Sequence, residues 1–188
     1  MVQKHIFVVL FLLLSIQQTC AAPVAQSASQ RDNKSTAELE QGIFEGINRV
    51  RQTNGLNPLK QSADLQKLAR AQSRDMAENG YMGHVDSRGR DLKARLKDAK
   101  ITGWREIGEN VARAFGYERI DEEMVKGWLR SKTHRANIMS REFDSTGVGV
   151  VKGSDGYFYA AQIFIWRDRA VTVLGNTARR GGFGNAGP

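Results

Sequence analysis

The sequence predicts an α+β fold, a three-layer α-β-α sandwich with a central, largely antiparallel sheet. Two observations lead to this prediction. Several segments repeat apolar residues at the three- and four-residue spacing of amphipathic helices, which must bury one face. The segment from Tyr157 to Trp166 instead shows little polar alternation, so helices should cover both faces of the sheet that contains it. With 188 residues, the chain is long enough for one such domain.

The N-terminus has the pattern of a secretory signal. Lys4 precedes an apolar run over residues 6–16, and small residues follow it. We therefore expect residues 1–22 to be a signal peptide and the protein to be secreted, to the extracellular space or the periplasm. No later segment approaches the ~20 apolar residues of a membrane span, so we do not expect a transmembrane protein. Residues 23–36 are mostly small and polar and are expected to form a disordered linker.

Cysteine content and net charge indicate a secreted protein without disulfides that is attracted to anionic surfaces. Cys20 is the only cysteine, so a protein cleaved after it contains no disulfide and must be stabilised by packing. The formal net charge is +8, and loss of a leader that holds Lys4 and no acidic residue would leave +7. This charge attracts anionic surfaces such as polysaccharide or lipid headgroups. Exported proteins are commonly basic for solubility or adhesion, so we expect no nucleic-acid function.

The first two helices are predicted from their capping residues and periodicity. Ser35 and Glu38 have the spacing of a capping box in front of an apolar stripe that continues to Asn54. After a short connection at Pro58, Ser62 is expected to cap a second helix that ends at Asn79 and Gly80. Both helices are amphipathic and should pack against the sheet.

Two further helices are expected later in the chain. One covers about residues 91–99 and carries a basic face that we interpret as solvated, made of Lys93, Arg95, Lys97 and Lys100. The other is expected to be capped by Asp121 and to bury Trp128 in the core before the chain leaves it at Ser131 and Lys132.

Three strands complete the predicted domain. Residues 105–112 have apolar side chains on one face of a pleat, and residues 146–152 and 157–166 flank a turn that contains Gly153 and Gly156. The last two strands should therefore pair as a hairpin. We place the folded domain at residues 37–170 and expect the glycine-rich residues 171–188 to be a disordered tail.

Glu109 occupies an unusual place in the first of these strands. It falls between Ile107 and Val111, so pleat parity puts it on the apolar face. A carboxylate facing a core needs a partner, for which a metal ion or an imidazolium would serve. The alternative is a shorter strand with Glu109 at its exposed end. The residues alone favour this alternative, because carboxylates are almost never fully buried.

Two histidines remain after a leader that contains His5. His84 lies on a loop rich in glycine and polar residues, and His134 lies where the chain leaves the fourth helix. His84, Glu109 and His134 are separated by 25 residues in each step (109 − 84 and 134 − 109). Two imidazoles and a carboxylate would be a suitable set for zinc, with an open coordination position. The alternative is two surface histidines and a salt-bridged glutamate.

Three segments resemble successive signatures of the CAP superfamily, which comprises the cysteine-rich secretory, antigen-five and pathogenesis-related proteins. They are Gly83-His84-Val85-Asp86, Gly108-Glu109-Asn110-Val111-Ala112, and the stretch from Trp128 to Ile138 that contains His134-Arg135-Ala136-Asn137-Ile138. The similarity runs from about residue 37 to 165 and includes the closing strand pair with Gly147 to Val150 and Gln162.

The resemblance implies an α-β-α sandwich with a central cleft lined by two histidines and two glutamates, which takes a divalent metal in some members. His84, Glu109 and His134 match three positions of this tetrad. Ser131 stands where the second glutamate is usual, as in the cysteine-free, bacterial-looking branch of the family. We therefore expect at most weak zinc binding by His84, Glu109 and His134, which falls in acid as the imidazoles protonate near ~6.5.

The functions of the family are diverse, and membership of a fold does not choose among them. We expect a monomeric binding module for a lipid or other small apolar ligand, or for a cell-surface component, rather than an enzyme. One alternative is a metal-assisted, peptidase-like hydrolase in which Glu109 is the base. Another is an adhesin that binds anionic polysaccharide through its basic residues.

Overall fold

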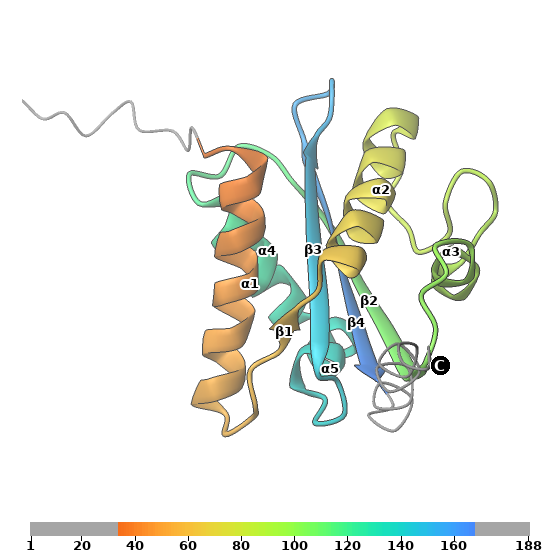
Figure 1. The fold of residues 1–188 in the computed structure, drawn as a ribbon. Coiled ribbons are helices and arrows are strands. Elements are labelled where there is room, and N and C mark those ends of the chain that lie inside the picture. Colours follow the sequence, from red (N-terminus) through yellow and green to blue (C-terminus); the bar gives the residue numbers. More distant parts are fainter. Residues whose placement is uncertain (1–33, 168–188) are drawn as a thin grey trace, which may run out of the picture.

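The computed structural model describes residues 34–167, and it is a three-layer α-β-α sandwich, as predicted (Figure 1). One face of the sheet is covered by α1 (Thr36–Thr53), α4 (Ile120–Arg130) and α5 (Lys132–Met139), and the other by α2 (Ala63–Asn79) and α3 (Leu92–Asp98). The strands are β1 (Lys60–Gln61), β2 (Trp104–Ala114), β3 (Ser145–Lys152) and β4 (Phe158–Arg167). The predicted signal peptide, most of the predicted linker and the predicted tail lie outside the described residues.

The sheet has the strand order β1-β3-β4-β2. β4 pairs antiparallel with both β3 and β2, so the predicted hairpin is confirmed. Its turn uses Gly156 at φ +83°, a conformation that glycine adopts without strain. β1 was not predicted, because two polar residues after Pro58 carry no strand pattern. It pairs parallel with the start of β3, where Lys60 is opposite Ser145.

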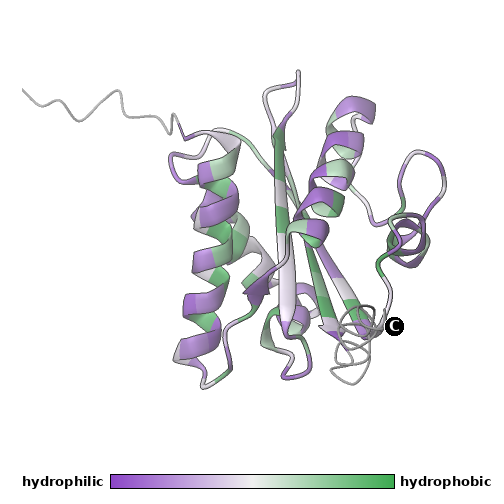
Figure 2. Cartoon of the chain, in the orientation of Figure 1, coloured by the Kyte–Doolittle hydropathy of each residue, from purple (hydrophilic) through white to green (hydrophobic). Residues whose placement is uncertain are grey.

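Alternate residues of β4 serve the two cores. Ala160 and Phe164 pack with the layer of α1, α4 and α5, which includes the fully buried Trp128. Tyr159, Ala161, Ile163 and Ile165 pack with α2 and α3. The hydropathy colouring shows the corresponding pattern, with apolar residues concentrated on the sheet and on the helix faces that meet it (Figure 2). The absence of polar alternation in this segment therefore identified a strand that is covered on both faces.

Helix α2 lies directly on β3 because two glycines leave room for its backbone. A Cβ atom built on Gly147 would be 2.1 Å from the backbone nitrogen of Gln66, and one built on Gly149 would be 2.2 Å from that of Arg70. Ser73 reinforces the contact by donating a hydrogen bond to the Gly149 carbonyl at 2.8 Å. The close approach fixes the position of α2, from whose end the His84 loop begins.

Helix α1 begins as predicted and is anchored at its other end by a buried cation. The capping box of Ser35 and Glu38 is present. Arg51, at the end of α1, is fully buried and donates hydrogen bonds to backbone carbonyls of Asn57, Ile138, Ser140 and Phe143. Burial lowers the pKa of the Arg51 guanidinium. One side chain thus joins α1 to the carbonyl groups at the end of α5.

Of the two other predicted N-terminal caps, Ser62 is the N-cap residue of α2 as predicted, whereas Asp121 does not cap α4. Ser62 precedes α2, but its side chain makes no capping hydrogen bond. Asp121 lies inside the first turn of α4, whose N-cap residue is Arg119. The Asp121 carboxylate accepts a hydrogen bond from Lys34 at 3.1 Å instead, so a tertiary contact replaces the local cap.

Side chains form hydrogen bonds with backbone groups of β3 and β2 that are not used in strand pairing. On β3, the Val150 N–H donates to the buried carboxylate of Glu40 at 3.0 Å, and Arg70 pairs with the same carboxylate. On β2, the carbonyl of Val111 accepts from Trp128 Nε1 at 3.0 Å and the carbonyl of Glu109 accepts from Asn137 Nδ2 at 3.2 Å. Among residues 34–167, no helix combines the length and the hydropathy needed to cross a bilayer.

Candidate functional site

The fold brings His84, Glu109 and His134 together from three elements. His84 lies on the loop between α2 and α3, Glu109 lies in the middle of β2, and His134 lies in α5. His84 Nδ1 is 3.0 Å from Glu109 Oε2, and the two imidazole ring centres are 6.4 Å apart. The expectation that His134 lies beyond the fourth helix was incomplete, because Ser131 ends α4 and caps a separate helix, α5, that carries His134.

Glu109 is buried, with 3% of its side chain exposed. The interpretation favoured by the residues alone, an exposed strand end, is therefore wrong. Pleat parity is confirmed, because Val111 and Ile107 on the same face belong to the core beneath α2 and α3. The strand continues to Ala114, which explains why Glu109 is not at its end.

Arg95 is the partner that compensates the Glu109 charge. Its Nη2 donates to both carboxylate oxygens, at 2.9 and 3.1 Å. The prediction that Arg95 belongs to a solvated basic face is wrong, because only 4% of its side chain is exposed, whereas Lys93 and Lys97 are exposed. Arg95 and Leu96 are both buried in α3, but neighbouring residues of a helix do not share one face, so spacing along the chain gave no signal for the burial of Arg95.

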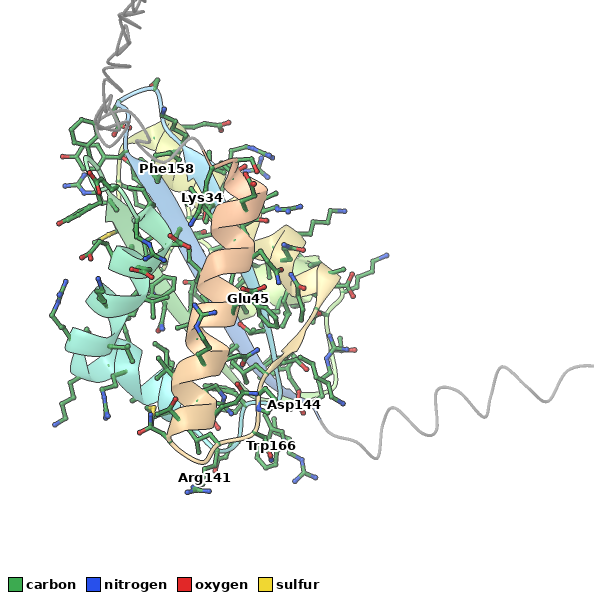
Figure 3. The ribbon with its side chains drawn as sticks, turned by 90° about the vertical axis from the view of Figure 1, so that its left-hand side faces the viewer. Lys34, Glu45, Arg141, Asp144, Phe158 and Trp166 are labelled. Carbon is green, nitrogen blue, oxygen red and sulfur yellow. The ribbon has the colours of Figure 1, made fainter. Side chains whose placement is uncertain are left out.

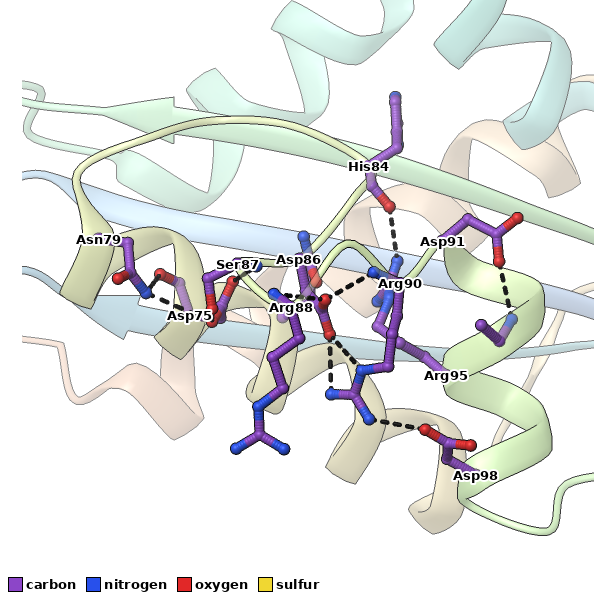
Figure 4. A network of polar contacts seen from close by, with 12 residues as sticks. Asp75, Asn79, His84, Asp86, Ser87, Arg88, Arg90, Asp91, Arg95 and Asp98 are labelled. Atoms are coloured by element: carbon purple, nitrogen blue, oxygen red, sulfur yellow. Dashed lines mark hydrogen bonds and ion pairs between the residues drawn. The ribbon is translucent and has the colours of Figure 1, made fainter.

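The loop that carries His84 is held by several backbone contacts. Arg95 Nη2 also donates to the His84 carbonyl at 3.1 Å (Figure 4). Gln72, on α2, donates to the Gly83 carbonyl at 2.9 Å. The buried Asp86 carboxylate accepts from the backbone N–H groups of Arg88 and Arg90 and pairs with the Arg90 side chain. The imidazole is therefore presented from a fixed loop, although 55% of its side chain is exposed.

Two asparagines that sequence reasoning missed hold His134. Asn110, which is fully buried on the opposite face of β2 from Glu109, donates to the His134 carbonyl at 3.2 Å. Asn137 donates to the Asn110 side-chain oxygen at 2.9 Å. A Cβ atom at Gly108 would lie 3.0 Å from the Asn137 oxygen, so this glycine provides the space. The sequence held one signal for Asn110: the alternation of β2 puts this amide on a face of the strand that a helix layer covers.

The two imidazoles differ in their preference for a proton. The hydrogen bond to Glu109 raises the pKa of His84, against the opposing effects of partial burial and of the Arg95 charge. Partial burial and the nearby His84 lower the pKa of His134. An ionised Glu109 accepts a hydrogen bond from Nδ1 of His84, so Nε2 is the ring nitrogen that does not contact Glu109. The site thus pairs an imidazole that favours protonation with one that favours the neutral form.

The fit of these residues to a metal ion depends mainly on the histidines. Both oxygens of Glu109 already accept from Arg95, and Ser131 Oγ lies 3.2 Å from Thr133 Oγ1. Within residues 34–167, no group of three or more His, Cys, Asp and Glu side chains is arranged so that it could hold a metal ion. In this geometry Glu109 orients His84, in the manner of the carboxylates that support metal-bound histidines.

A concave feature of about 390 Å³ lies between α1 and α4. Apolar side chains and glycines form much of its wall, and charged residues stand around it. The lining residues used below are Gly46, Arg49, Val50, Val125, Lys126 and Leu129. We call this feature the α1–α4 groove.

A comparison with protein families decides the family of this chain. The sequence profile described as the CAP, or cysteine-rich secretory protein, family matches residues 44–166. The chain belongs to the CAP family. The matched range begins inside α1 and ends in β4, so it covers all elements that build the His84, Glu109 and His134 site.

Individual CAP relatives agree with the fold. The chain is 35% identical over 118 residues to the uncharacterized protein YkwD of Bacillus subtilis, and the match covers 63% of this chain and 44% of that protein. Among solved structures, an extracellular SCP-domain protein from Bacillus anthracis is 29% identical with a TM-score of 0.62, and the match covers 70% of this chain and 41% of that one. This CAP chain thus spans less than half the length of either relative.

A third structure shares the fold over nearly its whole length. An outer surface protein of Borrelia burgdorferi is 21% identical to this chain with a TM-score of 0.64. The match covers 72% of this chain and 97% of that protein. Of the proteins named here, the one from Bacillus anthracis is described as extracellular and the one from Borrelia burgdorferi as an outer surface protein.

Proposed function

We propose that this CAP protein is a secreted binding module that takes a small apolar ligand, of the size and shape of a single acyl chain with an acidic head, in the α1–α4 groove. The groove is the observation that supports this proposal. Its volume of about 390 Å³ falls within the range of small-molecule sites. Secretion is supported by the leader-like pattern of residues 1–22 and by the extracellular description of the Bacillus anthracis relative.

The groove walls suit an apolar chain. Val50, Val125 and Leu129 provide apolar surface, and Gly46 contributes no side chain that would fill the space. A Cβ atom at Gly46 would be 3.3 Å from Val125, so the two helices approach closely at the base of the groove. A ligand that covers these side chains removes apolar surface from water, which is the main source of affinity in such sites.

The rim of the groove suits an acidic head group. Arg49 and Lys126 line it, one from each helix, together with Glu122, and Lys126 already pairs with Glu123 at 2.8 Å, so Arg49 is the cation that a ligand would meet. Within the described residues, the Arg49 side chain pairs only with Glu45, at 3.7 Å and exposed to solvent, and exposed pairs contribute little free energy. A carboxylate or phosphate at the end of an acyl chain can therefore compete for this guanidinium.

The environment of Glu109 supports binding over the hydrolase alternative. A general base must reach the proton that it removes. Here both carboxylate oxygens accept hydrogen bonds from Arg95, and one also contacts His84. Use of Glu109 as a base would require it to give up these contacts inside a buried site, where an unpaired Arg95 would be costly.

The test is a fatty-acid binding measurement with palmitate and wild-type protein. A Val50→Trp variant should weaken binding at least tenfold because the larger ring occupies the groove. Leu68→Trp is the matched control, since Leu68 lines a different cavity between α2 and the segment that follows it. Equal palmitate affinity in wild type and Val50→Trp would exclude the groove as the site, and loss in Leu68→Trp alone would place the ligand in the other cavity.

Weak zinc binding at His84, Glu109 and His134 remains a proposal, and one feature favours it. The Glu109 contact to Nδ1 fixes the His84 ring, whose other nitrogen does not contact Glu109, and His134 favours its neutral, metal-binding form. We propose that the imidazoles supply the protein ligands and that Glu109 orients one of them. Zinc there would act as a Lewis acid or as an anchor for an anionic ligand.

Calorimetric titration of zinc into metal-free protein tests this second proposal. His84→Ala and His134→Ala should each abolish the measurable heat, whereas Lys132→Ala, an exposed change in the same helix as His134, should preserve it. Affinity should fall as the pH drops and the imidazoles protonate. Equal binding by wild type and both histidine variants would rule out this site.

A further inference from the structure

We propose that one end of the sheet docks on an anionic lipid membrane surface. This end, which we call the aromatic tip, is formed where β2 ends and β4 begins. Its residues are Arg113, Phe115, Tyr117, Lys152, Tyr157 and Phe158. The inference does not depend on what occupies the α1–α4 groove or the histidine site.

The pairing of the strands gathers these residues. Phe158 is opposite Ala114 of β2 on one side and Lys152 of β3 on the other. The rings of Phe115 and Tyr157 are 5.1 Å apart between centres. Phe158 lies at the same end of the molecule as Lys34, whereas Trp166 and Arg141 lie at the opposite end (Figure 3). The tip therefore lies at one pole of the sandwich, with Tyr157 and Phe158 on opposite faces of β4, and away from the middle of β2 where Glu109 lies.

The side chains of Phe115 and Tyr117 are exposed to solvent and are not part of either core. They are 58% and 54% exposed, and Gly116 between them has a φ of +78° that turns the chain outward. Among residues 34–167, only Met82 and Val85, on the His84 loop, are other large apolar side chains with comparable exposure. A phenyl ring has no polar group to hydrate, so its exposure beside other rings indicates a surface that an apolar environment covers.

Two cations lie against the rings of the tip. The Arg113 guanidinium is 5.1 Å from the centre of the Tyr157 ring, and the Lys152 ammonium is 5.4 Å from that of Phe158. Neither forms an ion pair with a carboxylate among the described residues. Aromatic rings that enter the boundary between headgroups and acyl chains, next to cations that meet lipid phosphates, are the composition of membrane-surface anchors.

A membrane explains the tip better than an acidic polysaccharide does. Both partners would attract Arg113 and Lys152, but a hydrated sugar polymer gives Phe115 little apolar surface to enter.

Site-specific spin labelling tests the inference on the full chain. A nitroxide is attached at Tyr117→Cys in a Cys20→Ser background, and the matched control carries it at Met82→Cys. Both positions are exposed, so neither change should prevent folding. Accessibility to oxygen and to a water-soluble nickel complex is measured with phosphatidylcholine vesicles, with vesicles that also contain phosphatidylglycerol, and with heparin.

The expected result is immersion of position 117 only on the phosphatidylglycerol vesicles, seen as a several-fold rise in the ratio of oxygen to nickel accessibility, with position 82 unchanged. Arg113→Gln combined with Lys152→Gln should weaken vesicle binding about tenfold or more, because each cation near an anionic surface contributes a factor of about five. If position 117 stays in water on vesicles that carry the protein, or if heparin alone protects it, the membrane inference is wrong.

Discussion

Arg95 Nη2 lies 2.9 and 3.1 Å from the two carboxylate oxygens of Glu109, and this pair joins α3 to β2 directly below His84. The same nitrogen also holds the His84 carbonyl. One guanidinium therefore compensates a buried charge and positions the loop of the candidate site. His84 of this CAP domain is thus held by a buried ion pair, whereas His134 is held by Asn110.

Removal of Arg95 should destabilise the protein strongly. Arg95→Met leaves the Glu109 carboxylate buried without its main partner, and breaking a buried pair in this way costs about 3–5 kcal/mol. Addition of Glu109→Gln to this variant should recover part of the loss, because the uncompensated charge disappears. Urea unfolding measures both effects, with Lys93→Ala on the exposed side of the same helix as control. A change below about 1 kcal/mol in Arg95→Met would contradict the role of this pair in stability.

The two histidines should titrate in a fixed order. Because the Glu109 hydrogen bond raises the pKa of His84, the stability that this contact contributes is fully present below the unfolded value near ~6.5 and is lost as the pH rises through the folded pKa. NMR titration should place the pKa of His84 above that of His134, whose pKa is lowered. Glu109→Gln should reduce the difference. A pKa of His134 at or above that of His84 would contradict the geometry.

Gly149 should not tolerate even one methyl group. In Gly149→Ala, the new Cβ would overlap the backbone of α2 at Ala69 and Arg70, which cannot move as a flexible side chain would. We expect a loss of about 3 kcal/mol, the upper part of the range for overpacked cores. Gly127→Ala is the control: its Cβ meets nothing within 4 Å, so better helix propensity should stabilise it by about 0.5–1 kcal/mol. Thermal unfolding of both variants makes the comparison.

Arg51 should be essential to the junction of α1 and α5. Arg51→Met keeps the volume but leaves the carbonyls of Ile138 and Ser140 without their donor, at a cost of about 1–3 kcal/mol for each buried group. Chemical unfolding should show a clear fall in stability for this variant and almost none for the exposed Arg49→Ala. Equal stabilities would mean that water replaces the guanidinium.

The sequence was sufficient for most of the fold because its signals are local. The capping box at Ser35 and the glycine turn before β4 each depend on a few neighbouring residues, and both are present. β1 and the separate helix α5 were missed because they depend on contacts and boundaries that no local pattern shows. Two residues pair at β1 only because β3 lies beside them, and a single residue, Ser131, separates α4 from α5.

The site was predictable only in part. Pleat parity placed Glu109 on the apolar face, but the burial of Arg95 could not be distinguished from the exposure of Lys93 and Lys97, since all three lie in one basic run. What decides the state of Arg95 is a carboxylate on another element, 14 residues later. Asn110 was missed for a similar reason. Its side-chain amide can be buried because Asn137, on α5, donates a hydrogen bond to it, and this partner is far away in the sequence.

The groups that occupy the edges of the sheet affect how copies of the domain meet. Glu40 takes the Val150 N–H on β3, while Trp128 and Asn137 take the Val111 and Glu109 carbonyls on β2. An incoming strand would have to displace a buried carboxylate on one edge and an indole and an amide on the other. These three side chains therefore act as barriers to strand addition, and thus to domain swapping and fibril growth, at the positions where the sheet would otherwise be extended.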